Sequence, residues 1–143
     1  MKCELHIDKS LEEKVLIYAH EKNKAVEEIY NFVANQDIEL IGYKDNEIIK
    51  INPNNVNCFI VEDSKIFAIT DSEKLRVKLR LYVLEEILGE SFIKINQSCI
   101  ANIRKIKKFD SSISGTLSVV FKNGYIDYVS RRNIKSIKER LGL

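Results

Sequence analysis

The chain has 143 residues, enough for one ordinary domain or for a domain of about 100 residues with a small additional lobe. Hydrophobic residues make up 45%, charged residues make up 31% and there is one proline, so wholesale disorder is excluded. A formal net charge of only +2 selects no class of partner. Because the sequence has neither an apolar run of about 20 residues nor a signal peptide, we expect a cytoplasmic protein.

The charge is unevenly distributed along the chain. Residues 1–74 hold 9 basic and 15 acidic side chains, a net charge of −6, whereas residues 75–143 hold 14 and 6, a net charge of +8. All arginines lie in the second part. This segregation favours a polyanionic partner for the C-terminal half. A basic face that only keeps the protein in solution would give the same pattern.

The acidic N-terminal region, residues 1–43, predicts a small α/β lobe. Residues 23–36 carry apolar side chains on one helical face, with Asn23 as N-cap. A lobe of this size holds little core, so we expect it to lean on the rest of the chain or on a second subunit, with the joint at residues 44–47. The strands expected in this lobe are residues 3–7, 14–19 and 38–43.

From residue 47 onward, apolar and polar residues mostly alternate, which predicts short antiparallel strands. Asn123-Gly124 is the strongest hairpin signal, and we expect a type I′ turn there. Residues 82–90 predict a short helix, and residues 130–142 a terminal one. The fold class is therefore mainly β with minor α, an α+β domain over residues 47–143. Its strands are expected within residues 46–55, 56–70, 75–81, 92–109 and 116–130.

The sequence contains no recognisable catalytic pattern. His6 and His20 are the only histidines, and there is no HExxH spacing, nucleophile elbow or glycine-rich phosphate loop. Cys3, Cys58 and Cys99 are odd in number and form no CxxC pair, which suits reduced thiols, and Cys99 fits a small buried side chain. We therefore expect no enzyme, no cofactor, no metal site and no small-molecule substrate.

Two basic stretches carry side chains suited to nucleic acid. In residues 92–109 the isoleucines can face a core while amide and basic side chains remain outside. Arg131, Arg132 and Asn133 stand at a strand-to-helix turn, where a helix N-terminus adds N–H donors for phosphate. Arg, Asn and Gln can pair bidentately with base edges. Because no helix-turn-helix is visible, any DNA contact must come from loops and turns of the β domain.

These stretches, residues 87–109 and 117–143, closely resemble the LytTR DNA-binding domain of bacterial transcription regulators. The resemblance implies an elongated antiparallel β fold that inserts loops into successive major grooves of promoter DNA. It implies base contacts by Gln97, by Arg132 and, from the turn at residues 64–65, by Lys65. Asn102 could equally be a structural residue that bonds the turn backbone. The implied phosphate or positioning contacts are Lys94, Ser98, Asn102, Arg104, Lys105, Arg131 and Asn133.

The sequence departs from the family at Asn96-Gln97, where His or Ser followed by a basic residue is common. Residues 1–43 are too short for a receiver domain and resemble the lobe of stand-alone members, which a small membrane protein often governs. We therefore expect a regulator that binds double-stranded promoter DNA as a homodimer, with a small membrane protein as a second candidate partner. The alternative is a protein-interaction adaptor whose basic face docks an acidic protein.

Overall fold

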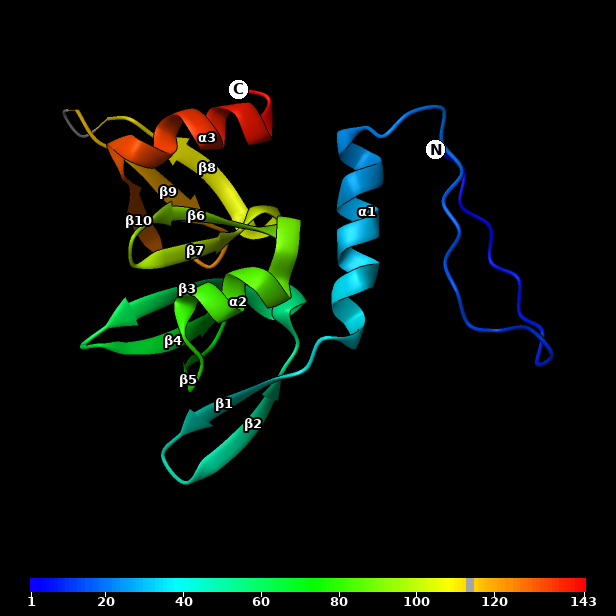
Figure 1. The fold of residues 1–143 in the computed structure, drawn as a ribbon, viewed down its shortest axis with the longest axis horizontal. Helices are drawn as coiled ribbons and strands as arrows, with labels where there is room; N and C mark the ends of the chain where they lie inside the picture. Colours follow the sequence, from blue (N-terminus) through cyan, green and yellow to red (C-terminus); the bar gives the residue numbers. More distant parts are fainter. Residues whose placement is uncertain (113–114) are drawn as a thin grey trace.

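The computed structural model describes residues 1–112 and 115–143 of the chain, which form three α-helices, four short 3-10 helices and ten strands (Figure 1). The helices are α1 Lys24–Ala34, α2 Leu81–Leu88 and α3 Arg131–Leu141, with the 3-10 turns η1 Asn35–Asp37, η2 Pro53–Asn55, η3 Gly89–Ser91 and η4 Ile103–Lys105. The strands are β1 Leu40–Lys44, β2 Glu47–Ile51, β3 Val56–Glu62, β4 Lys65–Thr70, β5 Lys74–Val77, β6 Phe92–Asn96, β7 Cys99–Asn102, β8 Ile106–Asp110, β9 Leu117–Phe121 and β10 Ile126–Val129.

The strands form two antiparallel sheets. The larger sheet has the order β2-β1-β5-β4-β3-β7-β6, and the smaller one has the order β10-β9-β8. The predicted class, mainly antiparallel β with minor α, is therefore confirmed. No helix in residues 1–112 or 115–143 is both long and apolar enough to cross a bilayer.

Two hydrophobic cores lie on opposite faces of the larger sheet. Phe59 of β3 points into the first core, which α2 closes with Leu84 and Leu88. Cys58 and Ile60, the neighbours of Phe59, point into the second core, which the smaller sheet and α3 close. Alternate side chains of one strand thus fill different cores. This arrangement explains why β3 is apolar and buried along most of its length.

The N-terminal region differs from the prediction. The helix is confirmed as α1, and Asn23 caps it by accepting a hydrogen bond from Val26 N at 3.1 Å. The strands expected at residues 3–7 and 14–19 are not formed, and residues 1–23 run as two extended legs beyond α1 (Figure 1). A lone two-stranded hairpin is marginal in water, and no strand within residues 24–112 or 115–143 pairs with these legs.

The expected joint at residues 44–47 is a hairpin turn. β1 and β2 pair along their whole length across this turn, and Asp45 takes a φ of 51°. β1 also joins β5 in the larger sheet, and Leu40 and Ile51 are buried in the first core. The third strand expected in the N-terminal lobe therefore forms, but it belongs to the main sheet.

Two local predictions are also corrected. The strand expected over residues 75–81 ends at Val77, and Leu81 already begins α2. At the β9–β10 turn only Gly124 has a positive φ, 91°, and its N–H donates to Phe121 O at 2.9 Å. A type I′ turn needs positive φ at both central residues, so the expected I′ geometry at Asn123-Gly124 is wrong.

Candidate nucleic-acid interface

Three turns lie at the same end of the molecule, on the left in Figure 1. They are the β3–β4 turn at residues 63–64, the β6–β7 turn at residues 97–98 and the junction of β10 with α3 at Ser130. Each joins elements that pack on the second core. The fold thus gathers segments that are far apart in the sequence.

Backbone hydrogen bonds join these three turns to one another. Val61 N, near the end of β3, donates to Ser98 O in the β6–β7 turn at 2.8 Å. Ser130 N, at the start of α3, donates to Ile95 O of β6 at 2.9 Å. The β6–β7 turn is therefore the middle member of a connected frame, and the side chains that project from it are held in a fixed relative position.

Asn96 holds the β6–β7 turn from inside. Its side chain is 1% exposed, and its Oδ1 accepts a hydrogen bond from Ser98 N at 2.8 Å. Its Nδ2 donates to Asp127 Oδ1 at 3.0 Å and to Tyr128 O at 2.8 Å. All the hydrogen-bonding groups of this amide are therefore used inside the protein, and Gln97, the next residue, is exposed at the tip.

Sequence reasoning missed the role of Asn96 and treated the residue only as a departure from the family. The available signal was local: an Asn two residues before a turn residue can accept that residue's N–H in an Asx turn. The bonds from Nδ2 to β10 had no signal in the sequence, because that strand lies about thirty residues away.

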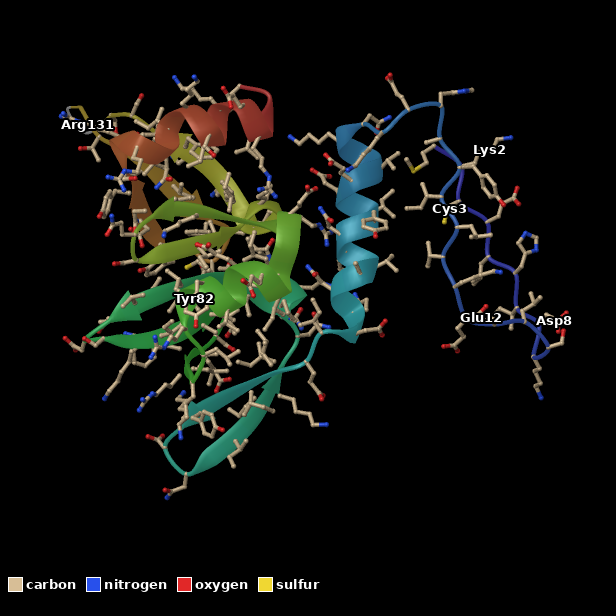
Figure 2. All side chains as sticks on the ribbon, viewed as in Figure 1. Lys2, Cys3, Asp8, Glu12, Tyr82 and Arg131 are labelled. Atoms are coloured by element: carbon tan, nitrogen blue, oxygen red, sulfur yellow. The ribbon has the colours of Figure 1, made fainter. Side chains whose placement is uncertain are left out.

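The start of α3 presents two arginines. Arg131 and Arg132 are exposed in its first turn, and Figure 2 shows Arg131 at the edge of the molecule. Asn133 is half-buried instead, and its Nδ2 donates to Ser130 Oγ at 2.7 Å while its N donates to Ser130 O at 2.9 Å. Asn133 therefore fixes the start of the helix, and the arginines point outward beside the unpaired N–H groups of the first turn.

The β3–β4 turn carries Lys65 at its far side. Asp63 and Ser64 have φ values of 51° and 61°, which is the left-handed geometry of a tight type I′ hairpin. Lys65 is exposed, and its register partner Glu62 forms an ion pair with Lys74 at 2.5 Å. The turn thus offers both a cation and acidic side chains at the same end as Gln97 and Arg132.

Lys94 lies on β6, three residues before Gln97. Its side chain is exposed and lies 3.8 Å from Glu85 of α2. At about 3.3 Å per residue, this places its backbone roughly 10 Å from that of Gln97. Lys94 therefore borders the end that carries the three turns and does not lie at its tip.

Asn102 lies at the opposite end of β7. It is 3% exposed, its Nδ2 donates to Val56 O at 2.9 Å, and its Oδ1 accepts from Arg104 N at 3.1 Å. Both groups of the amide are used inside the protein. The geometry thus favours the alternative reading of Asn102 as a structural residue.

Arg104 and Lys105 follow at that same end, away from the three turns. The Arg104 guanidinium stacks 4.4 Å from the ring centre of Phe32 in α1. Lys105 lies 3.6 Å from Asp71, whose pKa is held below its usual value by a hydrogen bond from Asn57 and by the Lys105 charge. The structure does not bring these two predicted phosphate contacts to the candidate interface.

Residues 1–112 and 115–143 contain no group of three or more His, Cys, Asp and Glu side chains placed to hold a metal ion. Cys58 and Cys99 are free and fully buried, as expected for Cys99. Contact with Cys58, together with burial, raises the pKa of the Cys99 thiol. A protonated, buried thiol is a poor nucleophile.

Comparisons with known proteins decide the family of this chain. The model of the LytTr DNA-binding domain matches residues 46–142. The chain belongs to the LytTR family. The structure has the antiparallel β fold that the resemblance implied.

Full-length relatives and one solved LytTR structure agree with this assignment. Uncharacterised HTH-type transcriptional regulators of Staphylococcus aureus strains MSSA476 and NCTC 8325 are 40% and 39% identical over 146 residues, covering 100% of this chain and 99% of each relative. The LytTr DNA-binding domain of a protein described as a methyl-accepting/DNA response regulator from Bacillus cereus superposes with a TM-score of 0.69 at 22% identity, over 73% of this chain and 97% of that one. The relatives' HTH label does not describe this fold, because strands separate α1 from α2 and α2 from α3.

Proposed function

We propose that this protein is a non-enzymatic, sequence-specific transcription regulator that reads repeats in double-stranded promoter DNA. One observation carries the proposal: three turns, joined by backbone hydrogen bonds, project Gln97, Arg132 and Lys65 from the same end. Membership of the LytTR family supports DNA as the partner. The relatives' names, transcriptional regulators, support the regulatory role.

The side chains at the tips of the turns contact the bases. The Gln97 amide can donate to and accept from an adenine edge, and the Arg132 guanidinium can donate twice to a guanine edge. Both side chains are exposed, while Asn96 and Asn133 hold the backbone beneath them. A reader held on a fixed backbone loses little conformational entropy on binding, which favours discrimination between bases.

Groups around these tips contact the phosphates of the DNA backbone. Arg131 and the free N–H groups in the first turn of α3 can neutralise and bond a phosphate on one side. Lys94 and the Ser98 hydroxyl lie on the β6–β7 side. Such contacts fix the register of the protein on the duplex without reading its sequence. Asn102, Arg104 and Lys105 are not included, because they lie at the other end of β7.

The test is fluorescence anisotropy of the full chain with a duplex from its own upstream region and with a scrambled duplex. We expect tighter binding to the native duplex and a steep fall with salt for both, by about 0.9 in log affinity per log salt for each phosphate contacted. The ratio between the two duplexes should persist at the higher salt concentration.

The same titration addresses the adaptor alternative. Equal binding to both duplexes that disappears with salt would leave only a non-specific basic surface and would contradict the proposal. No binding to either duplex would favour an adaptor that docks an acidic protein.

A further inference from the structure

The N-terminal segment leaves many apolar side chains in water. Leu5 and Ile7 on its first leg are 83% and 86% exposed. Val15, Leu16 and Tyr18 on its second leg are 58%, 61% and 90% exposed. Single exposed apolar residues are ordinary, but a contiguous group of this kind marks an interaction surface.

The two legs follow the path of a β-hairpin, but no backbone hydrogen bonds join them as paired strands. A turn folds the chain back at Asp8, where Leu11 N donates to Asp8 O at 3.1 Å and Ser10 N donates to Asp8 Oδ1 at 2.9 Å. In Figure 1 the legs run back along each other beyond α1. No strand is formed within residues 1–23, so the backbone groups of the legs remain available for pairing.

Helix α1 is also incompletely covered. It contains no fully buried residue, although Val26, Ile29 and Val33 share one face and are half-buried. Tyr30 is 64% exposed, and Phe32 is 38% exposed although its ring stacks on Arg104 of the β domain, so the helix also leaves apolar surface in water. An amphipathic helix normally buries its apolar stripe, which indicates that a covering layer is missing.

We propose that a second copy of this chain supplies this layer, by pairing its own legs with those of the first copy into a four-stranded sheet that packs on both α1 helices. The alternation in the sequence favours this arrangement. Residues 3–7 alternate apolar and polar, as in a strand with one solvated face, whereas residues 15–18 are apolar on both faces, as in an inner strand. Two strands from one chain are too few to be stable, and a second copy doubles them.

The charge and the apolar area of this segment also suit self-association. Residues 1–23 carry four lysines and five acidic side chains, so two copies meet with little net repulsion. Eight large apolar side chains of residues 1–30 are exposed. At roughly 100 Å² for each side chain, these cover about the 800 Å² per partner that a standard interface buries.

This inference goes beyond the proposed function and does not depend on it, because the legs and the outer face of α1 lie away from the three turns (Figure 1). If both proposals hold, the second copy brings a second set of turns, and a duplex with two repeats can be read by one dimer.

The test is sedimentation velocity of the full chain without DNA, at roughly 50 µM, where a dimer with a micromolar Kd is the main species. We expect the measured molar mass of the wild type to be twice the 16.6 kDa of one chain. Leu16→Asp and, separately, Ile7→Lys should weaken self-association by about tenfold or more, because each places a charge in the apolar layer. Ile48→Asp is the matched control, since Ile48 is also highly exposed but lies on β2.

Circular dichroism checks that each variant keeps the β fold. Hydrogen exchange gives a second reading, because the amides of residues 14–18 should be protected in the wild type and exchange rapidly in Leu16→Asp. A wild-type chain that stays monomeric would overturn the proposal and point to another partner, such as a membrane protein, for this surface. A dimer that survives both substitutions would place the interface elsewhere and would also overturn it.

Discussion

Asn96 and Gln97 are neighbours with opposite environments. The amide of Asn96 is buried and bonds Ser98 and two groups of β10, whereas Gln97 is exposed at the tip of the turn. We expect the first residue to hold the turn in place and the second to read DNA. Replacing each residue by alanine, in separate variants, distinguishes a loss of stability from a loss of DNA binding.

Asn96→Ala should lower the free energy of unfolding by roughly 2–4 kcal/mol, because it removes three hydrogen bonds and leaves buried partners unpaired. Gln97→Ala should leave stability within about 0.5 kcal/mol of the wild type, because surface side chains contribute little. The same Gln97→Ala change should reduce the preference for the native duplex. Urea unfolding and anisotropy measure the two effects. Equal stability losses in both variants would contradict this division.

Asn102→Ala offers a second test at the residue scale. Val56 O would lose its donor and Arg104 N its acceptor, so the free energy of unfolding should fall by roughly 1–3 kcal/mol. The salt dependence of DNA binding by the folded variant should not change, because no phosphate contact is lost. A salt slope smaller by about one, with unchanged stability in urea, would restore Asn102 as a phosphate contact.

Sequence reasoning at this scale selected exposed residues that lie on local turns. Gln97, Arg131 and Arg132 are exposed at one end of the molecule, and their contacts with DNA stay predictions. It missed the role of Asn96 and left two readings of Asn102 open, because their partners Tyr128 and Val56 lie 32 and 46 residues away in the chain. Hydrogen bonds over such separations leave no periodic pattern in the sequence.

At the scale of elements, the β1–β2 hairpin shows that the N-terminal region and the β domain share a core. Gly42 of β1 packs so closely that a Cβ there would lie 2.6 Å from Ile51 Cδ1 and 3.0 Å from Leu75 Cβ. Leu75 belongs to β5, so this contact joins the hairpin to the rest of the larger sheet.

Gly42→Ala should therefore destabilise the whole β domain by roughly 1–3 kcal/mol through overpacking. Ile48→Ala, a change at an exposed position of the same hairpin, should cost less than about 0.5 kcal/mol. Thermal unfolding followed by circular dichroism should show one transition shifted to lower temperature. A separate early transition, with the main one unmoved, would show that the hairpin is an independent unit.

Periodicity predicted the terminal helix and most strands, because each of these elements buries its apolar face within the chain. It also predicted α1, although the apolar face of this helix is only half-buried. It failed for residues 3–7, which alternate as regularly as the strands that form, and for residues 14–19, which are a continuous apolar run after Lys14. The pattern of apolar residues shows which faces must be buried. It does not show whether residues of the same chain or of another molecule bury them. The limit of β5 at Val77 was missed for a similar reason, because Leu81 continues the alternation and also fits the face of α2.

At the scale of the whole molecule, the two proposed surfaces lie at opposite ends. β7 runs from the β6–β7 turn to η4, and Arg104 beyond it contacts α1 through Phe32. The four residues of β7, roughly 13 Å of extended chain, lie between the turn that carries Gln97 and the 3-10 helix that carries Arg104. Self-association through the N-terminal segment would therefore leave the three turns accessible to DNA.

This separation predicts how the monomeric variant behaves with DNA. Leu16→Asp should bind a duplex with one repeat as the wild type does, because the turns are untouched. It should bind a duplex with two repeats more weakly by about tenfold or more, because the linked second site is lost. Anisotropy on both duplexes measures this, with Ile48→Asp as the control. An equal loss on the single repeat would instead indicate that residue 16 affects the DNA-binding end.

Sequence reading by these turns is tested by the effect of Arg132→Ala on the ratio of affinities for the native and scrambled duplexes, measured by anisotropy at fixed salt. Lys50→Ala removes one exposed positive charge from the distant β2 and serves as the control. We expect Arg132→Ala to reduce the ratio by about fivefold to 150-fold, which corresponds to the roughly 1–3 kcal/mol of a bidentate base contact, whereas Lys50→Ala should leave it unchanged. An unchanged ratio in Arg132→Ala, or an equal loss in both variants, would contradict the claim that these turns read the DNA sequence.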